Sequence, residues 1–366
     1  MNNYLKRYKI QLTTIGPIFI GSGELIKKRE WLLNRNKNQA TIIDFPKLFE
    51  FLTEKKLLDS FEQYLVSENK PLFVWMNENK ICENDYSRFT RYTLDTKGVN
   101  FTKDIRDIQT FIKDAYEEPY IPGSSLKGTI RNIILAKRIS DCNLNIDEIK
   151  KQINEYRGNK KKFLNREAKD LQVRMFNTKC KNEKKKADMV NDIMSGIRIS
   201  DSEPLNRDCL TLCQKIDYKV KGEENKLPIL RECIKPGTKI SMDMSIDTMD
   251  TDIDADYIMD AVDDFVAMYN QFFLENFADE ELYDGNVVYI GGGVGFASKT
   301  VLNQVLGRLE DFNRVKLISS TIDKTLGKPM HAKDFTLGVS PRVVKLTEYD
   351  GNLIQMGPCR IDIIPV

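Results

Sequence analysis

Residues 120–131, Tyr-Ile-Pro-Gly-Ser-Ser-Leu-Lys-Gly-Thr-Ile-Arg, combine a chain break with hydroxyl groups and cations. The Pro-Gly pair at 122–123 is expected to end the preceding element, and Ser124 or Ser125 to cap a following helix. The first N–H groups of a helix lack backbone acceptors, so they can bind an anion. Gly128 would let a ligand approach the helix backbone closely. The segment therefore predicts a phosphate-binding helix start.

The same expected helix carries a row of cations. Lys127, Arg131 and Arg138 fall at offsets of four and eleven residues, so on a helix they point in nearly one direction. Apolar residues occupy another face of this helix, namely Leu126, Ile130, Ile133 and Ile134. We expect one face to pack and the other to expose cations to an anionic ligand. The alternative is an ordinary capped helix whose Lys127 and Arg131 are only solvated.

A glycine-rich turn late in the chain would also bring backbone N–H groups close to a ligand. It contains Gly291, Gly292, Gly293 and Gly295, lies between an expected strand and an expected helix, and is followed by Lys299. It does not have the G-x-G-x-x-G spacing of a dinucleotide site, and the chain has no G-x-x-x-x-G-K-[ST] loop. A phosphodiester backbone is the expected ligand. The alternative is a tight turn that needs positive φ. A shorter glycine pair, Gly21 and Gly23, follows the first expected strand.

Residues for catalysis or metal binding are sparse. His331 is the only histidine and the only candidate imidazole base, although its polar loop favours a surface role. The run of aspartates from 243 to 254 lacks the glycine and closing glutamate of a calcium loop. Cys209 and Cys213 have no second pair at zinc-finger spacing. We therefore expect no metal, no cofactor and no catalytic residue.

Composition limits the class of protein. The 366 residues suffice for two domains, and 41% hydrophobic content excludes a wholly disordered chain. No apolar run approaches the roughly 20 residues that a membrane helix needs, and the first residues do not resemble a signal peptide. The seven cysteines form no disulfide pattern. We expect a cytoplasmic protein without a membrane partner.

The net charge of +2 conceals two oppositely charged segments. A basic segment at about 140–190 carries fourteen Lys and Arg against five Asp and Glu between 150 and 190. An acidic segment at 241–284 carries fourteen Asp and Glu and neither Lys nor Arg. Phosphate would be attracted by the first and repelled by the second. The basic segment is expected to be a charged helical insertion, and the acidic one to face solvent or a protein partner.

Periodicity predicts an α+β fold. Helices are expected at 44–66, 105–116, 123–138, 256–277 and 298–311. Strands are expected at 8–20, 197–202, 210–220, 227–233, 239–246 and 287–290, with a hairpin at 342–364 that turns at Asp350-Gly351.

Several motifs, in their order along the chain, resemble the RAMP superfamily of RNA-binding subunits in type III CRISPR effector complexes. They are Ile-Gly-Ser-Gly at 20–23, Ile-Pro-Gly-Ser-Ser-Leu-Lys-Gly at 121–128, Ile-Arg-Ile-Ser-Asp-Ser-Glu-Pro-Leu at 197–205, Gly-Gly-Gly-Val-Gly-Phe at 291–296 and Met-Gly-Pro-Cys-Arg-Ile at 356–361. The resemblance implies two ferredoxin-like (RRM-like) modules. These would be residues 1–205, including the basic insertion, and residues 206–366, including the glycine loop.

The resemblance also implies a function. It is closest to type III-A (Csm) subunits, and implies a non-catalytic subunit that binds the 3′ end of the crRNA and supports its maturation. The implied partners are the crRNA, the repeated backbone RAMP subunit and a small helical subunit. The expected RNA-binding residues are Gly21, Gly23, Ser124, Ser125, Lys127, Arg131, Gly291, Gly292, Gly293, Gly295 and Lys299. Two alternatives stay open: a metal-independent endoribonuclease that uses His331, and an adaptor that recruits a separate nuclease through the acidic segment.

Overall fold

The computed structural model describes residues 4–34, 37–67, 70–99, 107–142, 144–156, 158, 163–277 and 280–366. Its helices are α1 (Phe45–Glu54), α2 (Leu58–Ser67), α3 (Leu72–Glu78), α4 (Gly123–Ser140), α5 (Ile146–Glu155), α6 (Asn165–Phe176), α7 (Ala255–Phe272), α8 (Leu302–Leu306) and α9 (Asp311–Leu326). Its strands are β1 (Leu5–Thr14), β2 (Gly21–Ile26), β3 (Trp31–Asn34), β4 (Gln39–Ile43), β5 (Thr90–Gly98), β6 (Ile108–Phe111), β7 (Ile197–Ile199), β8 (Leu210–Lys219), β9 (Glu224–Ile234), β10 (Lys239–Asp247), β11 (Val287–Tyr289), β12 (Val343–Tyr349), β13 (Asn352–Gln355) and β14 (Pro358–Pro365).

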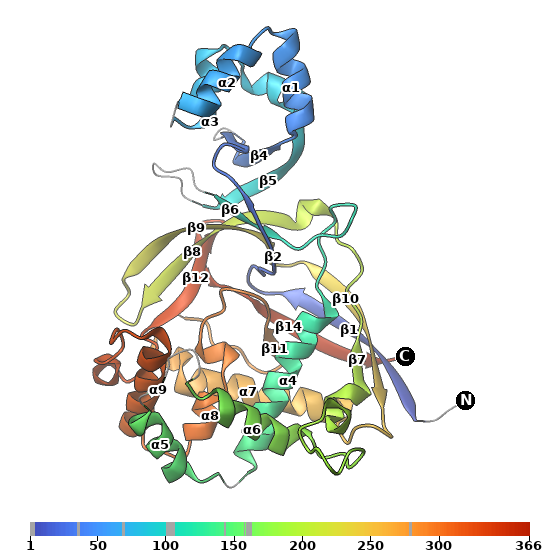
Figure 1. The fold of residues 1–366 in the computed structure, drawn as a ribbon, viewed down its shortest axis with the longest axis vertical. Coiled ribbons are helices and arrows are strands. Elements are labelled where there is room, and N and C mark those ends of the chain that lie inside the picture. The colour runs from blue at the N-terminus through green and yellow to red at the C-terminus, as the bar shows by residue number, and fades with distance from the viewer. Residues whose placement is uncertain are drawn as a thin grey trace.

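The strands form two sheets, and together with the helices they confirm a mixed α+β architecture. The lower sheet in Figure 1 has the antiparallel order β11-β14-β1-β10-β7. The upper sheet has the order β2-β6-β9-β8-β5-β4-β3, with β12 paired to β8 and β13 to β12. Each sheet takes strands from both sides of residue 205. The expected division of the chain at that residue therefore does not separate the two sheets.

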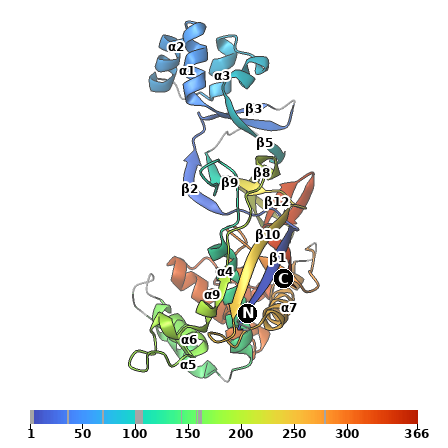
Figure 2. The same ribbon diagram turned by 90° about the vertical axis from the view of Figure 1, so that its right-hand side faces the viewer.

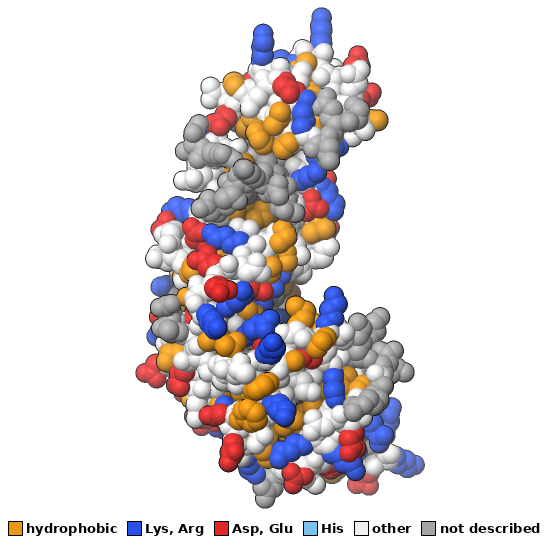
Figure 3. Space-filling view, turned by 90° about the vertical axis from the view of Figure 1, so that its left-hand side faces the viewer, with side chains coloured by type: hydrophobic (Ala, Val, Ile, Leu, Met, Phe, Trp, Pro, Cys, Tyr) orange, Lys and Arg blue, Asp and Glu red, His pale blue; other side chains and the backbone are white. Residues whose placement is uncertain are grey.

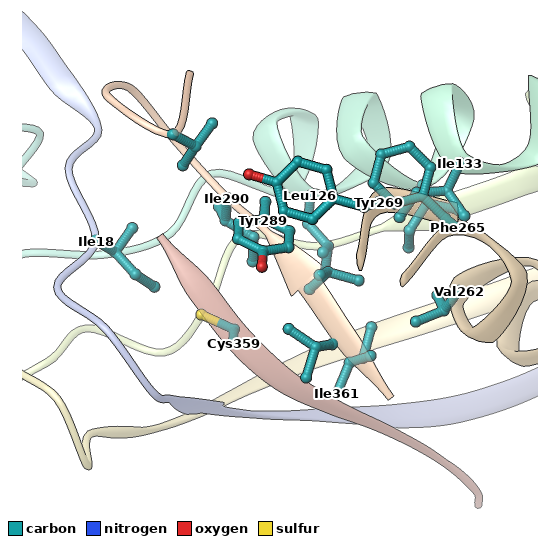
Figure 4. Close-up of a cluster of buried hydrophobic side chains, with 14 of the residues drawn as sticks. Ile18, Leu126, Ile133, Val262, Phe265, Tyr269, Tyr289, Ile290, Cys359 and Ile361 are labelled. Carbon is teal, nitrogen blue, oxygen red and sulfur yellow. The ribbon is translucent and has the colours of Figure 1, made fainter. Parts of the chain in front are cut away.

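The main core lies between the lower sheet and the two long helices α4 and α7. Figure 4 shows Leu126 and Ile133 from α4 close to Phe265 and Tyr269 from α7, with Ile361 of β14 nearby. All five side chains are buried. Burying each side chain of this size contributes about 1.5–3 kcal/mol before the entropy of ordering it is subtracted. This packing holds the N-terminal part of α4 in place against α7 and the lower sheet.

Helices α1, α2 and α3 form a separate small lobe above the upper sheet, as Figures 1 and 2 show. The lobe has its own core, in which Phe61 packs against Trp75 with ring centroids 5.0 Å apart. The helix predicted at 44–66 is confirmed as α1 and α2, and the break lies at Lys56, where φ is 58°. Asp44 caps α1 by accepting a hydrogen bond from the Lys47 amide.

Two predicted helices are wrong. The described part of 105–116 contains the strand β6, because Ile108 and Gln109 pair in parallel with Leu230 and Arg231 of β9. Residues 298–311 do not form one helix; a 3-10 turn, the short α8 and the first residue of α9 occupy that stretch. The predicted strands from 197 to 290 and the hairpin at Asp350-Gly351 are confirmed. Among the described helices none is long and apolar enough to cross a bilayer.

Candidate nucleic-acid interface

A cavity of about 510 Å³ lies where four separate segments meet. These are residues 20–21 at the start of β2, residues 124–133 of α4, Phe265 of α7, and the end of β11 with the glycine loop and turn that follow it. Six of the eleven predicted site residues line it: Gly21, Ser124, Ser125, Gly291, Gly292 and Lys299. Three motifs far apart in the sequence therefore contribute to one site.

The start of α4 is built differently from the prediction. Neither serine is the N-cap, because the helix begins at Gly123 and Pro122 occupies the cap position without a side-chain hydrogen bond. The first amide is instead satisfied from a distant motif, since Gly123 N–H donates to Oδ1 of Asp201 at 2.8 Å. A Cβ at Gly123 would lie 2.3 Å from the carbonyl oxygen of Ile199, so only glycine fits here.

The first turn of α4 offers unused polar groups to the cavity. Ser124 is exposed, and its N–H and hydroxyl have no partner among the described residues. The Ser125 hydroxyl is likewise unpaired within the described chain. A Cβ at Gly128 would meet no atom within 4 Å, so protein packing does not require a glycine there. The cavity can thus accept a hydrogen-bonding ligand beside the positive end of the helix dipole.

The predicted cationic face of α4 is not exposed. The Lys127 ammonium donates to the carbonyl of Ile197 at 2.6 Å, and burial is the main cause that lowers the pKa of Lys127. Arg131 forms an ion pair with Asp192 at 2.8 Å and lies over the ring of Phe176. Because both cations bind the chain itself, the prediction of an exposed basic face was wrong. Their role as RNA contacts stays a prediction.

Backbone conformation and close contacts within the chain explain why the loop after β11 is rich in glycine. Gly291, Gly293 and Gly295 have φ values of 84°, 93° and 94°, in the region that favours glycine. A Cβ at Gly291 would lie 2.2 Å from the carbonyl oxygen of Phe19, and one at Gly293 would lie 2.4 Å from Nη1 of Arg231. The turn alternative therefore accounts for these glycines by itself. Gly292 donates its N–H to the carbonyl of Phe19 at 2.6 Å, and Gly23 does not line the cavity.

Arg231 is a candidate residue that the sequence analysis missed. It lies on β9, its Nε donates to Gln109 at 2.9 Å, and its guanidinium stacks over Phe19 with 4.6 Å from Cζ to the ring centroid. Its buried Nη1 has no partner among the described groups. In the sequence it stands alone before Glu-Cys-Ile at 232–234, with no spacing signal of its own.

The His331 side chain has a buried hydrogen-bond partner that its sequence context did not predict. Its Nδ1 lies 2.7 Å from Oδ2 of Asp334, a fully buried carboxylate that also accepts from the Ser340 hydroxyl at 2.9 Å. Arg342 contacts the other oxygen of Asp334 at 3.5 Å. The histidine is therefore held against a buried carboxylate rather than free at the surface, as its polar loop had indicated. The histidine does not line the cavity.

The acidic segment is not simply a solvated surface. Asp250 pairs with Lys179 and Lys181, at 3.5 and 2.6 Å, so the acidic segment binds the basic one. Arg138 pairs with Asp252 at 3.0 Å. The described residues contain no group of three or more His, Cys, Asp or Glu that could hold a metal ion. Burial also raises the pKa of Cys209 to about 11, which disfavours the thiolate that a metal would need.

Comparisons with known proteins agree with the arrangement of these motifs. The RAMP superfamily model matches residues 11–296. The Csm5 protein of Streptococcus thermophilus is 31% identical over 332 residues, which cover 86% of each chain. Csm5 of Mycobacterium tuberculosis is 28% identical over 393 residues, with 99% of each chain covered.

Two solved structures share the fold. One is a chain of a cryo-EM structure of a Csm–crRNA–target RNA ternary complex from a type III-A CRISPR-Cas system, with a TM-score of 0.64, 20% identity and coverage of 97% of this chain and 100% of that one. The other is a crystal structure of T. onnurineus Csm5, with a TM-score of 0.63, 20% identity and coverage of 96% and 99%. The chain therefore belongs to the RAMP superfamily, and within it to the Csm5 subunits of type III-A CRISPR systems.

Proposed function

We propose that this chain is a non-catalytic crRNA-binding subunit that caps the 3′ end of the crRNA in a type III-A effector complex and supports crRNA maturation. The observation that carries the proposal is the cavity itself, where motifs from residues 20–23, 121–128 and 291–296 meet. Unpaired hydroxyls, a free amide and the cation of Lys299 suit phosphate and sugar groups. None of these groups requires a particular base.

Sequence-independent contact is what such a complex needs. Guide sequences vary, and target choice is delegated to base pairing between guide and target. A site that holds the backbone through amides and hydroxyls would accept any guide. The partners we propose are accordingly the crRNA, the backbone RAMP subunit and the small helical subunit, supported by a structural neighbour that is a chain of a Csm–crRNA–target RNA complex.

The lower sheet supports a ferredoxin-like module as part of this proposal. Its strands β14-β1-β10-β7 have the spatial order 4-1-3-2 when they are numbered along a β1-α4-β7-β10-α7-β14 path. Helices α4 and α7 cover one face of this sheet. A second module in the upper sheet, and an insertion at 140–190 within the first, remain parts of the proposal.

The two alternatives have less support. The endoribonuclease would need His331 beside the RNA, whereas the cavity lies elsewhere in the chain. The nuclease-recruiting adaptor would need a free acidic surface, whereas Asp250, Asp252 and Asp264 form ion pairs within the chain. Incubation of the purified protein with end-labelled crRNA precursor separates the three: retention without cleavage supports our proposal, cleavage supports the enzyme, and neither supports the adaptor.

Gly128 allows a matched pair of variants for the cavity. Gly128→Ala adds a methyl group that would meet no protein atom within 4 Å, so it should leave the fold intact and lower the RNA affinity far less than a charged side chain at the same position. Gly128→Glu places a carboxylate at the same point and should weaken RNA binding by at least tenfold at low salt, because phosphate is repelled. Equal affinity of the two variants would contradict a backbone-binding role for this cavity.

A further inference from the structure

Beyond the cavity, the glycine loop touches a second group of polar residues on the upper sheet. We call Lys215 on β8, Arg231 on β9, Lys345 on β12 and Lys299 after the loop the basic cluster. A Cβ at Gly293 would lie 2.4 Å from Nη1 of Arg231, and one at Gly295 would lie 3.4 Å from Cγ of Lys345. The loop therefore lies directly against the cluster.

Most of the positive charge in the basic cluster is not neutralised. Lys345 is paired, because its ammonium lies 2.6 Å from Oδ1 of Asp217. The side-chain ammonium groups of Lys215 and Lys299 make neither a hydrogen bond nor an ion pair with any described residue. Arg231 uses Nε on Gln109 but leaves the buried Nη1 without an acceptor.

The cations of the cluster influence one another. Burial is the main cause that lowers the pKa of Lys215; the positive charges of Lys345 and Arg231 lower it further, and the carboxylate of Asp217 partly opposes them. Burial and the charge of Arg231 likewise lower the pKa of Lys299. Half-buried like charges repel each other, and this repulsion is relieved when an anion binds among them.

The cavity and the basic cluster adjoin each other along the glycine loop. Gly291 and Gly292 line the cavity, Gly293 and Gly295 contact the cluster, and Lys299 belongs to both. Figure 3 shows Lys and Arg side chains gathered at mid-height on the face that carries β8, β9 and β12, beside a hollow between the upper and lower parts. A chain of phosphates that leaves the cavity across the loop would meet these cations next.

We propose that the basic cluster is a second phosphate-binding site, which holds the backbone of single-stranded RNA on the far side of the glycine loop from the cavity. The proposal rests on the proposed crRNA-binding function and adds a defined path to it. Lysine and arginine contribute charge without reading bases, so this site too would be independent of sequence.

The test compares two single variants that change the net charge equally. Lys215→Ala removes the unpaired lysine of the cluster that does not line the cavity. Lys333→Ala removes an exposed lysine of the segment between α9 and β12, and is the control. Filter binding of labelled single-stranded RNA over a range of salt concentrations gives the slope of log K against log salt. One lost phosphate contact should flatten this slope by about 0.7 in the cluster variant.

The outcomes are distinguishable. A flattened slope in the cluster variant with a wild-type slope in the control supports the second site. An unchanged slope in the cluster variant, or an equal change in the control, overturns it. If Gly128→Glu still weakens binding in that case, the cavity function survives without the second site; if Gly128→Glu has no effect either, the proposed function fails as well.

Discussion

Gly123 and Asp201 are joined across 78 residues by one hydrogen bond, in which the first amide of α4 donates to Oδ1 of the aspartate at 2.8 Å. The neighbouring Ser202 completes the connection, because its hydroxyl accepts from Ile121 N–H at 2.9 Å. The motif at 197–205 thus holds the turn that the motif at 121–128 forms. It also places a carboxylate at the end of a helix where an RNA phosphate would bind.

Replacing Asp201 should change stability and RNA affinity in opposite directions. Asp201→Ala loses the cap, which costs about 1 kcal/mol and lowers the thermal midpoint, whereas Asp201→Asn keeps an acceptor and costs less. Both variants remove a negative charge beside Ser124, so both should bind RNA more tightly at low salt. Differential scanning fluorimetry and filter binding measure the two effects. Weaker RNA binding by Asp201→Asn would show that this helix end does not meet phosphate.

Arg131→Ala should destabilise the segment around Asp192 without changing the salt slope of RNA binding. The side chain pairs with Asp192 and stacks on Phe176, and both contacts are largely shielded from water. Arg131→Lys keeps the charge but loses the planar stacking, so it should restore only part of the stability. Limited proteolysis of residues 177–196 reports the effect. A flatter salt slope in Arg131→Ala but not in Arg131→Lys, with normal protease resistance in both, would show that Arg131 contacts RNA phosphate.

Asp250 makes the contact between the basic and acidic segments depend on pH. Lys181 is the main cause that lowers the pKa of Asp250 below its usual value of about 3.8, and Lys179 contributes. A carboxylate with a depressed pKa stabilises the fold fully above its unfolded pKa, and loses this contribution as pH falls through the folded pKa. Asp250→Asn should therefore lower the thermal midpoint at pH 6, and its difference from the wild type should shrink as the pH falls below 3.8. Asp284→Asn, at an exposed aspartate outside these ion pairs, is the control; a Tm difference from the wild type that persists at low pH would contradict the ion-pair account.

His331→Ala should leave crRNA maturation unchanged in cells, although the histidine has a partner. Its removal leaves the buried Asp334 with one hydrogen bond fewer, so we expect a loss of about 1–3 kcal/mol in stability instead. Northern blotting of crRNA and a thermal melt of the purified variant separate the two effects. Accumulated unprocessed crRNA in a variant that still assembles would favour the endonuclease alternative.

The sequence predicted the strands and the hairpin better than it predicted side-chain contacts. Alternation and turn residues are local signals, so β8, β10 and the Asp350-Gly351 hairpin could be located from them. Strand β6 could not, because its conformation depends on pairing with β9, about 120 residues later in the chain. Long-range pairing overrides local propensity in such segments.

The prediction of an exposed cationic face on α4 was wrong for a similar reason. Helical spacing correctly placed Lys127 and Arg131 on one face, but spacing does not show what covers that face. The covering residues, Ile197, Asp192 and Phe176, come from the next part of the chain. Arg231 was missed because its link to the glycine loop exists only in three dimensions.

The most direct test of the central claim is a photo-crosslink from the RNA itself. A crRNA with 4-thiouridine near its 3′ end would be bound to the purified protein, irradiated and digested, and the crosslinked peptides identified by mass spectrometry. We predict crosslinks to peptides that contain Ser124 and Ser125, and to the peptide with the glycine loop and Lys299, because these residues line one cavity. Crosslinks confined to other peptides, with none at either segment, would contradict the assignment of this cavity to RNA.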